Sequence, residues 1–213
     1  ADTRVLATLP KRQLLAGYAE IAKCGRLVDA AFFNWLEGHA HLLLEGDPDA
    51  LRKAIRRACE MKAEIVAADE REAGRRQLLN LGHTFGHALE AECGYSDDLL
   101  HGEAVAIGMV LAFELSAQLG YCRPEDADRV RRHLAAVDLP TGFERLCARA
   151  WDPHRLIEHM RRDKKARGGQ LVFVLAQAIG KAFTSDRVPE DEVERLLAER
   201  IAEAYEETAT LMP

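Results

Sequence analysis

The chain has 213 residues, of which 48% are hydrophobic and 30% charged, and its formal net charge is −6. This composition is typical of a folded globular protein and excludes extensive disorder. The acidic balance argues against binding to a nucleic-acid backbone, and the longest apolar run, residues 104–113, is far shorter than the roughly 20 residues of a membrane helix. We therefore expect neither a nucleic-acid partner nor a membrane partner.

The cysteines and the first residues of the chain indicate in which cellular compartment the protein is expected. The five cysteines lie far apart and form no Cys-x-x-Cys pair. An odd, scattered set of this kind is typical of reduced thiols in a cytoplasm. No basic-then-apolar leader opens the chain, so no secretion signal is expected and a cytoplasmic location is predicted.

Helix signals dominate the first half of the chain. Apolar positions recur at helical spacing in residues 12–24, and residues 29–36 resemble a short helix with an aromatic face. The Asp-Pro pair at 47–48 is an N-cap followed by proline at the first helical position, and a helix with one apolar stripe follows it. We predict a further single helix over residues 77–93, with Gly94 as its C-terminal cap.

The second half continues in the same way, with one exception. Residues 101–119 are predicted to form a helix that ends at Gly120, and further helices are expected to begin near prolines 124, 153 and 189. The exception is a pair of β-rich runs joined at Gly180. We therefore predict a mainly α fold: a multi-helix domain with a small β-hairpin near residues 171–185. No Gly-x-Gly-x-x-Gly follows a predicted strand, so the sequence shows no nucleotide-binding fingerprint of its own.

Two histidines stand out as candidates for chemistry. His83 and His87 are four residues apart in a predicted helix, so both imidazoles lie on one face. Such pairs can bind a metal, but Thr84 stands where a zinc protease has its glutamate base. From spacing alone, the pair is more often two surface or packed histidines than a metal site.

The surroundings of this pair strengthen the metal hypothesis. Glycine in a helix costs about 1 kcal/mol relative to alanine. Gly82 and Gly86 flank His83 in the predicted helix, which suggests that a ligand or another backbone comes close. His101 opens the next helix after a short loop. The two helices are then antiparallel neighbours, and His101 can face His83.

A carboxylate is the expected completing ligand. Glu20 is the one acidic residue of a mostly apolar helix, and a carboxylate in that setting needs a partner. Spacing gives equal weight to a metal site and to a salt bridge with Lys23 at i+3. Two histidines, one carboxylate and an open position describe a catalytic zinc site, in which the metal acts as a Lewis acid.

Cations gather around these candidates. Lys62 falls on the predicted apolar stripe of its helix, and Arg76 lies one turn before Asn80. A basic run at 161–167 ends beside paired glycines. A charge run is usually a solvated face, but basic residues around a metal also suit a substrate bearing phosphate or carboxylate.

Two longer motifs carry a resemblance to a known family. Residues 79–90 read LNLGHTFGHALE and residues 100–109 read LHGEAVAIGM, and both resemble 3-dehydroquinate synthases of the sugar phosphate cyclase superfamily. Shorter matches in the same order extend the likeness from about residue 9 to residue 187. The resemblance implies that residues 11–213 form the C-terminal helical metal- and substrate-binding domain, with residues 1–10 as an interdomain segment. It also implies that the family's N-terminal α/β NAD-binding domain is absent from this sequence.

The family's activity follows as an expectation. Its members are lyases that convert 3-deoxy-arabino-heptulosonate 7-phosphate, a phosphorylated sugar acid, to 3-dehydroquinate and phosphate in the shikimate pathway. The reaction proceeds by transient oxidation, phosphate elimination, reduction and intramolecular aldol closure. The resemblance implies NAD and a divalent metal, zinc or cobalt, as cofactors, and a homodimer as the complete protein. Without the NAD domain, the isolated chain is expected to have weak or no activity.

The resemblance also implies a role for each candidate residue. It places the metal ligands at Glu20, His83 and His101, and it overrules the spacing argument for His87 as a ligand. His87 is implied to contact substrate or to relay protons. The other matched positions are implied to hold the substrate's carboxylate, hydroxyls and phosphate, and they are Lys23, Lys62, Glu72, Arg76, Asn80 and one lysine of the pair Lys164 and Lys165.

Three alternatives remain at this point. Another sugar phosphate cyclase, such as a 2-deoxy-scyllo-inosose synthase, would share the metal ligands and the NAD chemistry. A helical domain that stands alone would bind metal or a partner without catalysis. A polyol dehydrogenase with a similar two-domain plan would give net NADH, whereas a 3-dehydroquinate synthase gives none.

Overall fold

Helices make up most of the protein, as predicted. The computed structural model describes residues 2–69, 74–146, 149–166 and 171–211, and at positions 26, 27, 163–166 and 211 it describes the backbone only. The α-helices are α1 (Lys11–Val28), α2 (Ala30–Glu45), α3 (Pro48–Ala68), α4 (His83–Glu92), α5 (His101–Gln118), α6 (Pro124–Ala136), α7 (Pro153–Ala166) and α8 (Glu190–Leu211). Three short 3-10 helices, η1 (Thr3–Thr8), η2 (Arg75–Asn80) and η3 (Glu144–Leu146), and the strands β1 (Phe173–Ala178) and β2 (Lys181–Ser185) complete the described chain.

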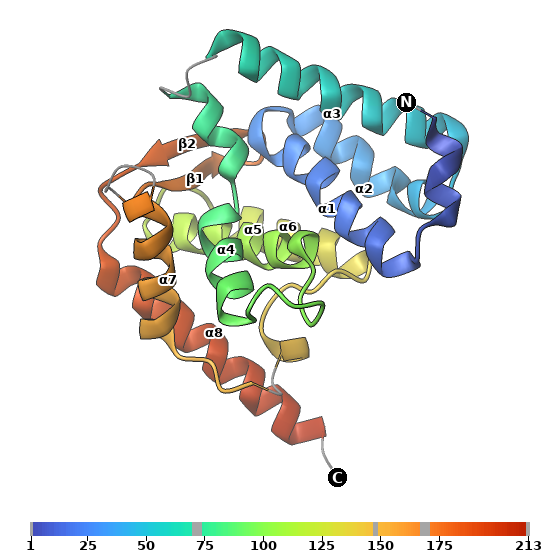
Figure 1. Cartoon of the computed structure of the whole chain (residues 1–213). Helices are drawn as coiled ribbons and strands as arrows, with labels where there is room; N and C mark the ends of the chain where they lie inside the picture. Colours follow the sequence, from blue (N-terminus) through green and yellow to red (C-terminus); the bar gives the residue numbers. More distant parts are fainter. Residues whose placement is uncertain (1, 70–73, 147–148, 167–170, 212–213) are drawn as a thin grey trace.

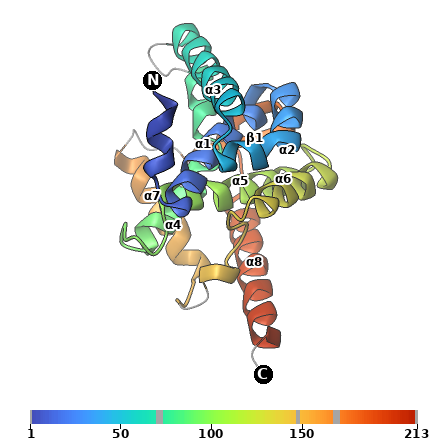
Figure 2. The ribbon, with the colours of Figure 1, turned by 90° about the vertical axis from the view of Figure 1, so that its right-hand side faces the viewer.

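Helix α5 is the centre of the fold. It packs against α1, α4, α6, α8 and β1, and in Figure 1 it crosses the middle of the molecule. Its residues from Ala104 to Phe113 are all buried, which is typical of a helix that is apolar on every side. Figure 2 shows the same centre from the side, with α8 running out toward the C-terminus. The first residue of α5, His101, therefore lies where α1 and α4 converge on this central helix.

Glycines let the backbones of α1 and α4 touch α5. A Cβ added at Gly102 would lie 2.0 Å from the carbonyl oxygen of Ala16 in α1. A Cβ added at Gly108 would lie 2.0 Å from the carbonyl oxygen of Gly82 at the start of α4. Only glycine fits at such distances, because the neighbouring atoms belong to the backbone and have no rotamer to change. These two contacts set the spacing of the three helix segments that carry the candidate ligands.

One predicted helix is wrong, because residues 77–93 form two elements. The 3-10 helix η2 ends at Asn80, and α4 begins only at His83. Between them Gly82 has a φ of +81°, a left-handed conformation that interrupts a right-handed helix. Gly82 therefore precedes α4 as its N-cap, and the close approach of Met109 and Val105 of α5 explains why it is glycine.

Two other boundaries differ from expectation. The short helix predicted over residues 29–36 extends to Glu45 as α2, because Ala40 and Leu43 continue its buried face as far as the left-handed Gly46. The hairpin is confirmed as an antiparallel pair in which Leu175 faces Phe183, although β1 begins at Phe173. The backbone N–H of Ala176 donates to Ser116 Oγ at 2.9 Å, which attaches the hairpin to α5.

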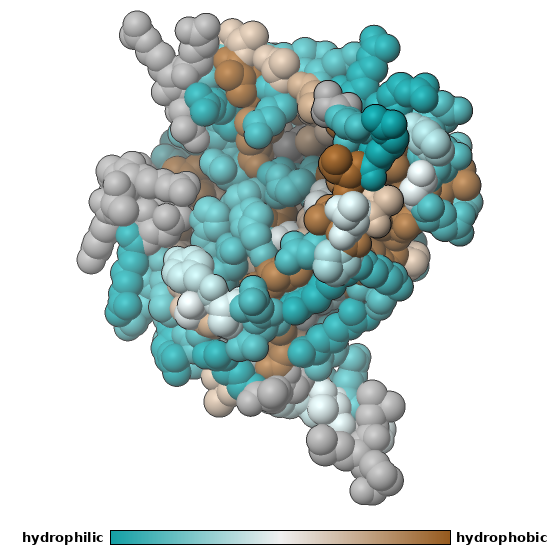
Figure 3. Space-filling model, turned by 45° about the vertical axis from the view of Figure 1, so that its right-hand side comes forward, coloured by the Kyte–Doolittle hydropathy of each residue, from teal (hydrophilic) through white to brown (hydrophobic). Residues whose placement is uncertain are grey.

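The surface gives no sign of a membrane segment. Within the described ranges, no helix combines the length and the apolar character that crossing a bilayer requires. In Figure 3, hydrophilic residues cover most of the visible face and hydrophobic residues lie among them in small groups, as on an ordinary protein surface.

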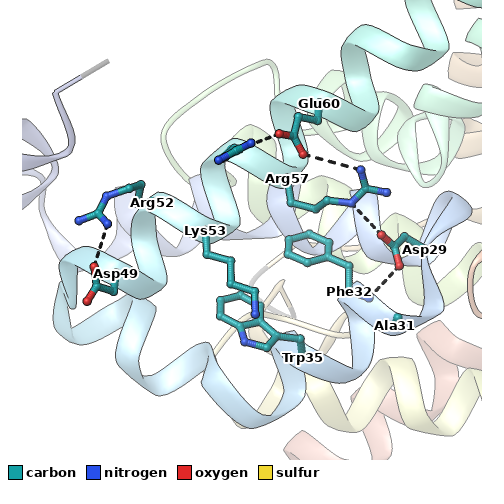
Figure 4. A pocket seen from close by; sticks show the side chains of 10 residues that line it. Asp29, Ala31, Phe32, Trp35, Asp49, Arg52, Lys53, Arg57 and Glu60 are labelled. Atoms are coloured by element: carbon teal, nitrogen blue, oxygen red, sulfur yellow. Dashed lines mark hydrogen bonds and ion pairs between the residues drawn. The ribbon is translucent and has the colours of Figure 1, made fainter.

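Asp29 joins two helices at the edge of the fold (Figure 4). Its carboxylate accepts a hydrogen bond from the backbone N–H of Phe32 at 2.9 Å, which caps α2, and another from Arg57 Nε of α3 at 2.8 Å. We expect Asp29→Ala to lower the free energy of unfolding by about 1–2 kcal/mol, because a lost N-cap alone has an effect of about 1 kcal/mol. Urea denaturation of the variant and the parent chain measures this difference.

Asp29→Asn is the matched control, because asparagine keeps the cap and loses the charge. Burial raises the pKa of Asp29, but the Phe32 N–H and Arg57 outweigh it and hold this pKa below its usual value. The ionised Asp29 therefore contributes its whole stabilising effect above about pH 4, the ordinary pKa of an aspartate in the unfolded chain. This contribution to the free energy of unfolding is lost as the pH falls through the lower pKa of the folded state. The difference in free energy of unfolding between the parent and Asp29→Asn should therefore become smaller at low pH. A difference that grows at low pH would contradict a stabilising charge on Asp29.

Candidate metal centre

Three side chains from three helices converge on one point. Glu20 comes from α1, His83 is the first residue of α4, and His101 is the first residue of α5. Glu20 Oε1 lies 3.8 Å from His83 Nε2 and 4.0 Å from His101 Nε2. Each residue offers a ligand atom, and all three atoms lie within 4.8 Å of one another. The structure therefore brings together the three residues that the resemblance implied as metal ligands.

Both imidazoles are oriented by oxygen atoms on their outer side. His83 Nδ1 lies 3.3 Å from the carbonyl oxygen of Leu81, and His101 Nδ1 lies 3.1 Å from each carboxylate oxygen of Glu90. Carbonyl and ionised carboxylate oxygens only accept hydrogen bonds, so Nδ1 is the donor in each ring. In the neutral rings, Nε2 then carries the lone pair that faces Glu20.

The carboxylate of Glu20 has one satisfied and one unsatisfied oxygen. Lys23 Nζ donates to Oε2 at 2.8 Å, so the salt bridge considered from the sequence is present. Oε1 is buried and has no hydrogen-bond partner among the residues that the structure describes. A buried carboxylate oxygen without a partner is costly, and a cation between it and the two Nε2 atoms would satisfy it. Two imidazoles, one carboxylate and a free position therefore fit a divalent metal of the zinc type.

The electrostatics prepare these groups for a cation. Burial, with a further contribution from the Lys23 charge, lowers the pKa of His83 to about 4, so this ring is neutral at neutral pH. Burial raises the pKa of Glu20, but Lys23, His83 and His101 outweigh it and lower the pKa, which keeps the carboxylate ionised. The hydrogen bond that His101 Nδ1 donates to the Glu90 carboxylate raises the pKa of His101, whose side chain is exposed.

His87 belongs to a second group that overlaps the first. Its ring centroid lies 5.2 Å from that of His83 and 6.1 Å from that of His101. With Glu90 and His101 it forms another cluster whose ligand atoms lie within 4.8 Å of one another. The sequence reasoning missed Glu90 as a candidate. Its position three residues after His87 places it on the same face of α4, which was the available signal.

A cavity of about 590 Å³ opens beside these residues, between α4, the start of α5 and α7. Its lining residues are His87, Glu90, Ala91, Tyr95, His101, His159 and Arg162. Lys164 and Lys165 lie one turn or less further along α7, and their side chains are outside the described part of the chain.

The remaining candidates differ in exposure. Arg76 and Asn80 are half-buried on η2, directly before the turn that leads to His83, and the backbone N–H of Arg76 donates to Asp69. Lys62 lies beside the buried stripe of α3 and not in it, because Met61 and Ile65 are the buried residues at this level. Glu72 lies outside the described residues.

Another cavity, of about 600 Å³, lies between α2 and α3 (Figure 4). Each of its basic side chains already has a partner from the same two helices or from Asp29 before them. Lys53 Nζ sits 4.4 Å from the ring centroid of Trp35, and the arginines form ion pairs with acidic neighbours. These pairs are Arg52 with Asp49, Arg56 with Glu60, and Arg57 with Asp29. The cavity is therefore a charged seam between two helices, and we assign it no ligand.

Solved structures share this fold. A 2-epi-5-epi-valiolone synthase from Streptomyces hygroscopicus, solved with NAD+ and Zn2+ bound, superimposes with a TM-score of 0.82 at 30% identity, over 95% of this chain and 55% of that one. A 2-deoxy-scyllo-inosose synthase, complexed with carbaglucose-6-phosphate, NAD+ and Co2+, matches in fold with a TM-score of 0.77 at 23% identity, over 94% of this chain and 56% of that one. The chain thus shares the fold of about half of each of these two synthases, and this fold defines its class.

The particular family follows from sequence. The family described as 3-dehydroquinate synthase C-terminal matches residues 17–166, and the chain belongs to it. The chain is 57% identical to the 3-dehydroquinate synthase of Rhodospirillum rubrum over 184 residues, which are 86% of this chain and 48% of that protein. It is 54% identical to that of Jannaschia sp. over 202 residues, 95% of this chain and 55% of that protein. The chain thus spans about half the length of the curated relatives it matches, and the resemblance stated from the sequence is confirmed.

Proposed function

We propose that residues 11–213 are the metal- and substrate-binding domain of a 3-dehydroquinate synthase, with residues 1–10 as the interdomain segment. The complete protein converts 3-deoxy-arabino-heptulosonate 7-phosphate to 3-dehydroquinate and phosphate, using NAD catalytically. The observation that carries the proposal is the buried Oε1 of Glu20, which faces Nε2 of His83 and His101 and has no hydrogen-bond partner within the described part of the chain. The relatives named 3-dehydroquinate synthase support the choice of reaction.

The metal ligands in this proposal are Glu20, His83 and His101. Zinc or cobalt held there supplies a Lewis acid that polarises substrate oxygens. We assign two roles to Lys23, which is only 5% exposed and donates a hydrogen bond to Glu20 at 2.8 Å. It keeps the carboxylate ionised, and its ammonium adds positive charge beside the place where an anionic substrate binds.

The proposal also assigns residues to the substrate. His87 lines the cavity, and histidine is the side chain most often used to transfer protons in catalysis, so we assign it substrate contact and proton relay. Arginine and lysine bind phosphate and carboxylate, and asparagine offers both a donor and an acceptor to hydroxyls. On this basis the substrate-binding set is completed by Lys62, Glu72, Arg76, Asn80 and one of Lys164 and Lys165.

NAD, the second subunit and the compartment belong to the proposal for the complete protein. NAD is held mainly by the N-terminal domain of the family, and the complete protein is a homodimer in the cytoplasm. The acidic net charge of −6 supports the absence of a nucleic-acid partner, and the lack of any long apolar run supports the absence of a membrane partner.

A related cyclization reaction is the second candidate. The 2-epi-5-epi-valiolone synthase shares the fold over 95% of this chain, but its 30% identity is well below the 57% found for a 3-dehydroquinate synthase. The candidate substrates of the two reactions are both phosphorylated sugars or sugar acids. The test below therefore compares phosphate release from the candidate substrates of both reactions.

Joining this chain to the N-terminal half of the Rhodospirillum rubrum relative tests the function. We expect the chimera, with NAD and cobalt, to release phosphate from 3-deoxy-arabino-heptulosonate 7-phosphate without net NADH, and the chain alone to release none. The same chimera with His83→Ala is the control and should be inactive. Faster release from another sugar phosphate would favour the second candidate, and net NADH would indicate a dehydrogenase.

A further inference from the structure

Glu90 lies directly behind His101. Both oxygens of its carboxylate are 3.1 Å from His101 Nδ1, although the two residues are 11 positions apart and belong to different helices. The Glu90 side chain is 12% exposed, whereas that of His101 is 49% exposed. The carboxylate is thus a largely buried support, and the imidazole in front of it reaches into the open part of the site.

The contact decides between the two overlapping clusters. Both contain His101, but the Glu20 cluster uses Nε2 and the Glu90 cluster lies on the side of Nδ1. A nitrogen that donates its hydrogen to a carboxylate has no lone pair for a metal. With Nδ1 occupied in this way, the lone pair of His101 faces Glu20 and His83.

The geometry points to Glu90 as a positioning residue that fixes the tautomer and the ring orientation of His101, and so directs the metal to Glu20, His83 and His101. This inference rests on the proposed function, since it requires that group to bind a divalent metal. Carboxylates that hold metal-ligating histidines in this way commonly strengthen metal binding 10–100-fold.

The two histidines differ in what holds them. The ring of His83 is supported by the backbone carbonyl of Leu81, which no side-chain substitution removes. The ring of His101 is supported by a side chain, and it is the more exposed of the two. Loss of the Glu90 side chain should therefore allow the His101 ring to reorient, while Glu20 and His83 keep their positions.

Glu90→Ala and Glu90→Gln test the inference, with Glu92→Gln as the matched control. Glu92 is another acid of α4 that pairs with a histidine, His159 at 3.0 Å, but this histidine is no member of the Glu20 group. Affinity for Zn2+ and for Co2+ is measured on the full chain by competition with a chelator. We expect Glu90→Ala to bind about 10–100-fold more weakly, Glu90→Gln to lie between it and the parent, and Glu92→Gln to bind as the parent does.

Nitrogen-15 NMR of the histidines gives the readout that a purely structural role would not move. In the metal-free parent His101 should carry its hydrogen on Nδ1, and in Glu90→Ala it should exchange between both nitrogens. Glu90→Gln keeps the shape and an acceptor oxygen, so it stays informative if Glu90→Ala fails to fold.

The outcomes separate this inference from the proposed function. If the parent binds metal and both Glu90 variants bind it as tightly as the parent, the role of Glu90 is wrong and the metal site stands. The same holds if His101 keeps its hydrogen on Nδ1 alone in Glu90→Ala. If the parent binds neither Zn2+ nor Co2+, the metal site itself is wrong and the role of Glu90 is overturned with it.

Discussion

Gly102→Ala is expected to destabilise the protein strongly. The new Cβ would lie 2.0 Å from the carbonyl oxygen and 2.5 Å from the Cα of Ala16. Both are backbone atoms, so α1 and α5 must move apart to relieve the overlap. Overpacking of this kind costs about 3 kcal/mol or more when no side chain can yield. Because Glu20 lies one turn beyond Ala16 and His101 directly precedes Gly102, the same movement separates two proposed ligands.

Gly17→Ala is the control for Gly102→Ala. Gly17 lies within α1 one residue from Ala16, but a Cβ there meets nothing within 4 Å. Alanine is the better helix former, so Gly17→Ala should stabilise the protein by up to about 1 kcal/mol. Chemical denaturation and zinc affinity are measured for both variants. A Gly102→Ala protein with the stability and zinc affinity of the parent would show that α1 and α5 are further apart than described.

Glu20→Gln is expected to abolish metal binding with little change of shape. The substitution keeps the size of the side chain and an oxygen, but it removes the charge that faces His83 Nε2 and His101 Nε2. Loss of a direct ligand should exceed the roughly 100-fold effect that loss of a supporting residue can have. Zinc affinity of the chain and phosphate release by the chimera should both fall below detection.

Glu60→Gln is the control for this variant, because Glu60 also pairs with a basic residue, Arg56, at 2.7 Å but lies on α3 in the charged seam. It should bind zinc as the parent does. The cluster of His87, Glu90 and His101 contains no part of Glu20. Zinc binding that survives Glu20→Gln would therefore place the metal in that second cluster and contradict the proposed ligands.

Much of the helical fold was predictable because its signals are local. Asp47 accepts hydrogen bonds from the backbone N–H groups of Asp49 and Ala50, as its place before Pro48 predicted. Gly94 and Gly120 have left-handed φ values directly after α4 and α5, where the sequence placed the helix ends. Such caps depend on neighbouring residues only, so a pattern of a few letters is sufficient to find them.

The break at Gly82 was not predictable in this way. Residues 77–93 have a continuous helical pattern, and a single glycine within it is compatible with a helix. What interrupts the helix is the backbone of α5, which lies so close that a Cβ at Gly82 would be 2.8 Å from Met109 N. That contact joins residues far apart in the sequence, and no local signal encodes it.

Only part of the candidate site was predictable, because local spacing identifies residues within one helix but not contacts between helices. Spacing within one helix favoured the pair His83 and His87, and the residues alone left Glu20 open between a metal site and a salt bridge. The choice of His101 over His87 as a ligand came from the family resemblance, because the group joins three helices. Glu90 was missed because a glutamate in a helix is usually solvated, and its partner His101 lies across a loop. Helical spacing placed Lys62 on the apolar stripe of its helix. In the structure Lys62 is exposed, because the buried residues at this level of α3 are Met61 and Ile65.

Anomalous diffraction at the zinc edge, from crystals of this chain grown with zinc, tests the central claim most directly. The account predicts one zinc peak per chain, bound by Glu20, His83 Nε2 and His101 Nε2, with Glu90 behind His101. A peak between His87, Glu90 and His101, or the absence of any peak at Glu20, would contradict it.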